Sequence, residues 1–203
     1  MKLIVLAVAA ACAIAAGEAR AGHAQSPYSY DVLLAAVARE TLWQAGIEDS
    51  QITRGDVLPV GVRCYRDRTA FETTFEQRFA RPARHIVAYY AGGRDVNLRH
   101  GTCANIRALL RGQLTVLTAG AYAVLLHETL HRQGLAGERV TTCFANESVR
   151  WGMRWFGFSD AQALRGRNLA FTYTRVYAPP SYRMGRPNCL LLTARRGWFA
   201  FTR

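Results

Sequence analysis

Apolar positions recur along the chain at the spacing expected for helices that pack against a core. Between residues 31 and 46 they fall three or four apart, with Ser29 or Asp31 as the candidate N-cap and Gly46 at the end of the pattern. Phenylalanines at positions 71, 75 and 79 predict another helix over residues 69–79. We expect both helices to contribute to the core.

Short stretches between and after these helices have the composition of strands. Residues 57–65 and 85–90 are strand candidates, and a turn over 92–95 leads into a return strand at 96–98. A short helix over 103–110 follows. The pattern predicts a small sheet beside a mainly helical core, which is an α+β fold.

A long apolar run over residues 114–126 lies in the middle of the chain. Its residues are apolar all round a helix, so we expect a buried central helix that ends near Gly134, a suitable left-handed cap. A second helix is expected to return antiparallel from a pivot near residues 134–135. A capping box at Ser159 and Gln162 predicts a further helix to about residue 177, followed by a tail.

The start of the chain has the three regions of a secretory signal peptide. Met1-Lys2 is followed by an apolar stretch and then small residues, and cleavage is expected after Ala21 or as late as Ala24. The apolar stretch is shorter than the ~20 residues that a membrane-spanning helix needs. We therefore expect residues 1–21 to be removed, leaving one domain over 22–203 that is secreted or extracytoplasmic.

An even number of cysteines remains after that removal. They are Cys64, Cys103, Cys143 and Cys189. Outside the cytoplasm such a count indicates two disulfides, and four cysteines allow three connectivities among which the sequence does not choose. As a working hypothesis, we pair Cys64 with Cys103 and Cys143 with Cys189.

The chain is strongly basic, with 26 Lys and Arg against 14 Asp and Glu and a formal net charge of +12 at pH 7. This charge favours anionic surroundings, so anionic envelope material is a candidate partner. The arginines are scattered and form no RNA-binding signature or helix-turn-helix pattern. No specific nucleic acid is therefore expected as a partner.

An H-E-x-x-H pentad, from His127 to His131, closes the apolar run. At ~100° per residue on an α-helix, His127, Glu128 and His131 share one face. Two neutral imidazoles one turn apart can hold a tetrahedral Zn²⁺, and the adjacent Glu128 can take a proton from a water on the metal. Three ionisable groups on a buried helix are costly without a partner, and a metal ion is a suitable one.

A site with three protein ligands needs one more donor, and the returning helix offers two glutamates. A pivot near residues 134–135 places Glu138 and Thr142 opposite the two histidines, so Glu138 is the first choice. Glu147 is the alternative, because many enzymes with an H-E-x-x-H motif take the third metal ligand from an Asn-Glu pair on the next helix, and Asn146-Glu147 has that form. The two glutamates are nine residues apart, about 180° around one helix, so only one of them can be a ligand.

The pentad resembles that of the zincin metallopeptidases, and a third glutamate ligand would place the chain with the gluzincins. The run HETLHRQGLAGERVTTC is similar to a group of exported bacterial proteins with the pattern H-E-x-x-H-x-x-G-x-x-x-E-x-x-x-x-C. The resemblance implies a zincin-like domain that binds zinc and hydrolyses a peptide or protein substrate. It also implies that a strand beside the central helix pairs with extended substrate, and the hairpin over 85–98 is the candidate.

Peptide hydrolysis also needs a donor for the oxyanion, which the pentad does not supply. Tyr182 is a mild preference, because a disulfide at Cys189 would hold the tail against the core. The other available side chains are His85, His100, Tyr173 and Arg183.

Two functions follow from these features. The first is a secreted zinc-dependent hydrolase, a metallopeptidase that uses metal-activated water, and the intact Glu128 favours it. The second is a catalytically weak or inactive zincin-like protein that binds envelope material or supports its structure. Arg132 and Gln133 favour the second function, because metallopeptidases usually carry an uncharged residue and then an apolar one at these positions.

Overall fold

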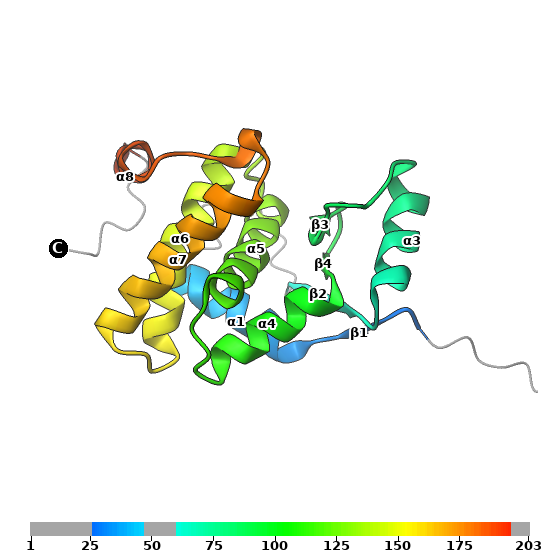
Figure 1. The fold of residues 1–203 in the computed structure, drawn as a ribbon, viewed down its shortest axis with the longest axis horizontal. Helices are drawn as coiled ribbons and strands as arrows, with labels where there is room; N and C mark the ends of the chain where they lie inside the picture. Colours follow the sequence, from blue (N-terminus) through cyan, green and yellow to red (C-terminus); the bar gives the residue numbers. More distant parts are fainter. Residues whose placement is uncertain (1–25, 47–59, 196–203) are drawn as a thin grey trace, which may run out of the picture.

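The computed structural model describes residues 26–46 and 60–195, and these form an α+β fold (Figure 1). The expected signal segment and residues 57–59 of an expected strand lie outside them. The elements run in the order β1 (Tyr28–Tyr30), α1 (Val32–Gln44), β2 (Gly61–Tyr65), α3 (Arg68–Phe79), β3 (Ala88–Tyr90), β4 (Asp95–Leu98), α4 (His100–Leu110), α5 (Val116–Arg132), α6 (Glu138–Trp155), α7 (Asp160–Tyr177), the 3-10 helix η1 (Pro180–Tyr182) and α8 (Arg186–Arg195).

Local capping signals in the sequence explain where two of the helices begin. Asp31 is the N-cap of α1, and its carboxylate accepts a hydrogen bond from the backbone of Leu34. Ser159 and Gln162 form the expected capping box at the start of α7. Four features differ from expectation: β3 begins at residue 88 rather than 85, α4 begins at residue 100 rather than 103, β1 is an additional strand, and α8 occupies the expected tail.

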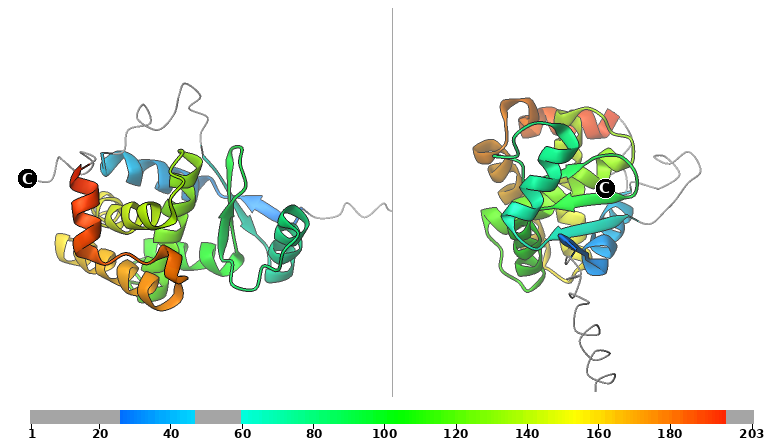
Figure 2. Two further views of the ribbon diagram at one scale, coloured as in Figure 1. Left: turned by 90° about the horizontal axis from the view of Figure 1, so that it is seen from above. Right: turned by 90° about the vertical axis from the view of Figure 1, so that its right-hand side faces the viewer.

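The four strands form one mixed sheet in the order β1-β2-β4-β3. β2 and β4 run parallel, whereas the outer pairs β1-β2 and β3-β4 are antiparallel. Figures 1 and 2 show the sheet standing between α3 on one side and the helical part of the molecule on the other. β3 is therefore an edge strand, and it lies on the side of the molecule where α5 contacts the sheet.

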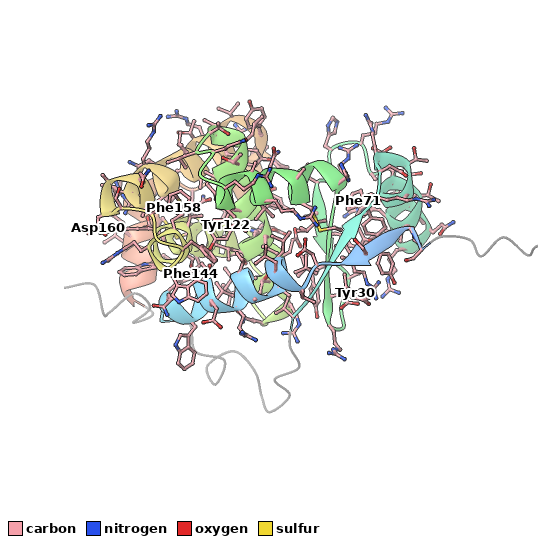
Figure 3. All side chains as sticks on the ribbon, turned by 90° about the horizontal axis from the view of Figure 1, so that it is seen from below. Tyr30, Phe71, Tyr122, Phe144, Phe158 and Asp160 are labelled. Carbon is pink, nitrogen blue, oxygen red and sulfur yellow. A yellow bond between two sulfur atoms is a disulfide. The ribbon has the colours of Figure 1, made fainter. Side chains whose placement is uncertain are left out.

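Each face of the sheet has its own apolar core. On one face, the phenylalanine stripe of α3 packs with strand residues, as expected, in a cluster that contains Tyr65, Phe71, Phe75 and Tyr89. On the other face, strand residues such as Val62 join the helices. The side-chain view in Figure 3 shows Phe71 on α3, and Tyr122 and Phe144 among the helices of the other core. Because side chains along a strand alternate between the two faces, the same strands contribute residues to both cores.

Helix α5 is the central helix of the fold, as the apolar run predicts. It contacts α4, α6 and α7, as well as β3 and β4. Its Leu125, Leu126 and Leu130 are fully buried. At Gly120 a side chain would overlap the ring of Tyr173, so the absence of a side chain lets α7 lie close against α5. None of the described helices is both long and apolar enough to cross a membrane.

Two disulfides fasten distant segments of the chain. Cys64 on β2 pairs with Cys103 on α4, and Cys143 on α6 pairs with Cys189 on α8. Both pairings of the working hypothesis are confirmed. The second disulfide holds α8 against α6 at the end of the molecule opposite α3 (Figure 1).

Candidate metal centre

The two helices that carry the site are joined by a tight turn. Gly134 has a φ of +96°, a conformation that favours glycine, and its N–H donates to the carbonyl of His131. Leu135 donates in turn to the carbonyl of Leu130. Helix α6 then begins at Glu138, where the positive end of the helix dipole favours a carboxylate. The turn thereby brings the start of α6 beside the last turn of α5.

One oxygen of Glu138 faces both histidines of the pentad. Its Oε2 lies 3.0 Å from Nε2 of His127 and 3.1 Å from Nε2 of His131. In the described part of the chain these three residues form a group that could hold a metal ion, with all ligand atoms within 4.8 Å of one another. His127 is 6% exposed, whereas the Glu138 side chain is 39% exposed, so the group is open on the glutamate side.

The other ring nitrogen of each histidine is also engaged. Nδ1 of His127 lies 3.1 Å from the hydroxyl of Thr142, and Nδ1 of His131 lies 2.5 Å from the carbonyl oxygen of Leu135. If both Nδ1 atoms carry the proton, they donate to these oxygens and leave both Nε2 lone pairs free. Such outer contacts fix the tautomer and ring orientation of metal-binding histidines.

The two carboxyl groups nearest the histidines have pKa values shifted in opposite directions. The hydrogen bond to His127, together with the charges of both imidazoles when protonated, lowers the pKa of Glu138 to about 2, although partial burial opposes the shift. Burial raises the pKa of Glu128, and the nearby histidines and a hydrogen bond from the Tyr90 backbone oppose that shift. Glu138 is thus suited to stay ionised, whereas Glu128 is suited to exchange a proton.

Tyr182 lies over the site from the C-terminal segment. Its ring stacks on that of His127, with centroids 5.4 Å apart and planes 26° apart. Burial, the charges of Glu138 and Glu128 and a hydrogen bond to Glu138 raise the pKa of Tyr182 to about 12. The phenol therefore keeps its proton at neutral pH and can donate it in a hydrogen bond.

A cavity of about 380 Å³ opens beside the pentad. His127, Glu128 and Tyr182 line one part of it, and the segment from Arg84 to Ala88, which leads into β3, lines another. The remaining wall comes mainly from α5, α6 and α7, including Val124, Asn146, Tyr173 and Thr174. The cavity can accommodate a small group or a side chain directly beside Glu128.

The other candidate residues from the sequence lie in different places. Glu147 is buried beside Arg167 and is not in the histidine group. His85 and Tyr173 line the cavity, whereas His100 and Arg183 do not. Arg183 instead donates to the backbone of Ala178.

Two features of the site were not predicted from the sequence. The backbone carbonyl of Leu135 contacts His131, and the sequence does not indicate this contact because every residue type has a backbone carbonyl. The cavity wall from α7 depends on how closely this helix approaches α5 at Gly120. A glycine in an otherwise apolar helix is a signal for such a close approach.

Comparison with models of protein families, with curated proteins and with solved structures gave no match for this chain. The residues of the site offer two imidazole nitrogens and one carboxylate, with a second carboxylate and a phenol beside them. Two imidazoles and a carboxylate are donors that a metal ion such as zinc accepts.

Proposed function

We propose that the chain is a zinc-dependent hydrolase of the zincin type, a metallopeptidase in which His127, His131 and Glu138 hold the metal. The observation that carries the proposal is the convergence of both Nε2 atoms on one oxygen of Glu138, with both Nδ1 atoms engaged by outer partners. Packing of an ordinary buried helix does not favour the convergence of two imidazoles and a carboxylate on one point. A metal ion removes the cost of gathering them there.

The metal and Glu128 have separate roles in this proposal. When bound, zinc supplies an electrophile that polarises a carbonyl and lowers the pKa of a water toward about 7. Glu128 accepts a proton from the attacking water and returns it to the leaving amine. Its raised pKa makes Glu128 a stronger proton acceptor than an exposed carboxylate would be.

Tyr182 is the candidate donor for the oxyanion that forms when water adds to the carbonyl. Its pKa of about 12 keeps the hydroxyl protonated, and its ring lies against His127. Such a donor is effective because it is oriented before the charge develops. Tyr182 therefore acts on the substrate oxygen, while Glu128 acts on the water.

Peptide or protein is the substrate class that best fits the surroundings of the site. β3 is an edge strand whose approach segment lines the cavity, and an edge strand can pair with an extended peptide. The adjoining cavity would then take one substrate side chain. Two disulfides are typical of proteins that fold outside the cytoplasm, so secretion or export belongs to the same proposal.

A catalytically weak or inactive zincin-like envelope protein is the second candidate. The net charge of +12 favours it, because such a charge attracts anionic envelope material. In that protein the metal would hold α5 to α6 without turnover. The two candidates differ in what Glu128 does, since only the enzyme needs a proton acceptor beside the metal.

A metal analysis combined with Glu128→Gln tests the proposal. The purified mature protein is expected to contain about one zinc per chain, and Glu128→Gln to retain it. Because general base catalysis typically contributes about 10²–10⁴-fold in rate, the variant should lose that much activity on any peptide found by screening. Glu40→Gln on α1, where the glutamate pairs with its neighbour Arg39, is the matched control and should keep full activity.

Three outcomes would count against the proposal. Wild-type protein that binds no zinc when zinc is supplied contradicts the metal centre itself. Wild-type rates in Glu128→Gln, with contaminating protease excluded, contradict the role of the base. Zinc binding without hydrolysis across a broad peptide library, together with tight binding of anionic envelope material, favours the second candidate.

A further inference from the structure

A second cluster of charged side chains lies between α6, α7 and α8. Glu147 stands at its centre, and we call Arg150, Arg167 and Arg186 around it the arginine cluster. Nη1 of Arg167 lies 3.5 Å from Oε2 of Glu147, and Nε of Arg186 lies 3.7 Å from Oε1. Arg150 acts on the same carboxylate through its charge. The cluster shares no residue with the histidine group.

The charges in this cluster do not balance. Two guanidinium groups contact one carboxylate and a third acts on it through its charge, which leaves a surplus of two positive charges. Glu147 is 7% exposed and Arg167 is 5% exposed, so water screens them poorly. Burial and the charges of Arg150 and Arg186 lower the pKa of Arg167, which indicates mutual repulsion among the arginines. An additional negative charge would relieve that repulsion.

The hydrogen bonds in the cluster are also incomplete. In residues 26–46 and 60–195, the buried donors Nε of Arg150 and Nε of Arg167 have no hydrogen-bond partner. Oε1 of Glu147 also has none, but it is an acceptor and needs a donor rather than an anion. The two contacts to Glu147 are longer than the ~2.7–2.9 Å of well-formed charged pairs. Glu147 therefore satisfies the arginines neither in charge nor in geometry. Buried guanidinium N–H groups require oxygen acceptors.

We propose that the arginine cluster binds a small inorganic oxyanion, phosphate or sulfate, beside Glu147. Guanidinium groups match the oxygens of such ions in shape and charge. Sulfate is a dianion, and inorganic phosphate near neutral pH is a mixture of the singly and doubly charged forms, so either ion would offset most of the surplus of the cluster. Arg186, whose side chain is 44% exposed, lies on the open side, and the burial of Glu147 and Arg167 admits an ion rather than a large molecule.

The bound ion would link three helices. Arg150 lies on α6, Arg167 on α7, and Arg186 is the first residue of α8. The disulfide from Cys143 to Cys189 already joins α6 to α8. The ion would fasten the start of α8, next to the segment that carries Tyr182, to both neighbouring helices. This inference does not depend on the proposed zinc chemistry.

Titration calorimetry of the full mature protein with inorganic phosphate, and separately with sulfate, tests the proposal in chloride buffer at fixed ionic strength. We expect one saturable site per chain and about tenfold weaker binding in Arg186→Gln, since a charged hydrogen bond is lost. Arg165→Gln, which removes an exposed charge from α7, is the matched control and should bind like wild type. His131→Ala should also bind like wild type, which separates this site from the metal centre.

Glu147→Gln gives an effect of the opposite sign. Removing the competing carboxylate raises the surplus charge, so the variant should bind phosphate more tightly, by about tenfold. A purely structural role of Glu147 predicts no such gain. The proposal is overturned if wild type shows no saturable binding of either ion, if Arg186→Gln and Arg165→Gln bind equally, or if folded Glu147→Gln binds no more tightly than wild type.

Discussion

Two glutamates of α6 show how one helix can use the same side chain in opposite ways. Glu138 opens the helix, is partly exposed, and faces two imidazoles that are neutral when they bind a metal. Glu147 lies in the middle of the helix, is buried, and faces three arginines. The pKa of Glu138 is lowered by its partners, whereas burial dominates at Glu147 and raises its pKa. Position on the helix, rather than residue type, separates them.

The turn before α6 determines which glutamate meets the histidines. With the pivot at residues 133–137, the start of α6 lies beside the end of α5, and Glu138 is the first helical residue. Glu147 comes nine residues later and points toward α7 and α8 instead. An Asn-Glu pair is therefore insufficient to identify a metal ligand, because the length of the preceding turn sets the register.

The strongest test of the difference between the two glutamates is to measure zinc affinity in Glu138→Gln and Glu147→Gln. Loss of a partner outside the ligand set typically costs about 10–100-fold in metal affinity, and loss of a ligand should cost more. We expect Glu138→Gln to lose more than about 100-fold and Glu147→Gln less than about tenfold. Competition with a chromogenic zinc chelator measures both. The opposite order would make Glu147 the ligand and refute the assignment.

Tyr182→Phe sharpens the comparison, because Tyr182 contacts the environment of Glu138 and not that of Glu147. Removal of one oxyanion donor typically costs about 10²–10³-fold in kcat, so we expect a loss near the lower limit with KM and zinc content little changed. Steady-state kinetics on a screened peptide provide the measurement. Tyr177→Phe, which alters the same cavity without touching His127, is the control. Equal activity in both variants would remove Tyr182 from the mechanism.

The smallest expected effect is a difference in the pH dependence of stability, measured by urea unfolding of the chelator-treated protein. The folded pKa of Glu138, about 2, lies below the unfolded value of about 4.3, so its stabilisation is present above pH 4.3 and is lost as pH falls toward 2. With the side chain 39% exposed, screening limits this to about 0.5–1 kcal/mol. Glu138→Gln should therefore be less stable than wild type at pH 7 and approach it on acidification.

Glu147→Gln should show the opposite pH trend. The folded state binds this proton more tightly than the unfolded state, so wild type loses stability as pH rises from the unfolded pKa through the raised folded value. The variant should therefore gain stability relative to wild type as pH rises. Parallel curves for the two variants would show that the difference between the two glutamates has no electrostatic origin.

Much of the helical hairpin could be predicted from sequence, because its signals are local. The apolar run fixes α5, glycine fixes its end, and helical periodicity places Glu138 and Thr142 opposite the histidines. The helix α8 could not be predicted, since residues 186–195 lack a clear apolar period. The arginine cluster was also beyond prediction, because its members come from three helices and form no block in the sequence.

The disulfide between Cys143 and Cys189 makes the proposed catalyst dependent on the redox state of its compartment. It anchors the segment that sets Tyr182 against His127, and it closes a loop with a sequence separation of 46 residues. In a reducing compartment the two thiols would be separate, and the phenol would lose its anchor while the histidines and Glu138 kept their positions on α5 and α6. The chain would then bind metal wherever it folds, but would have its full set of catalytic groups only where cysteines are oxidised.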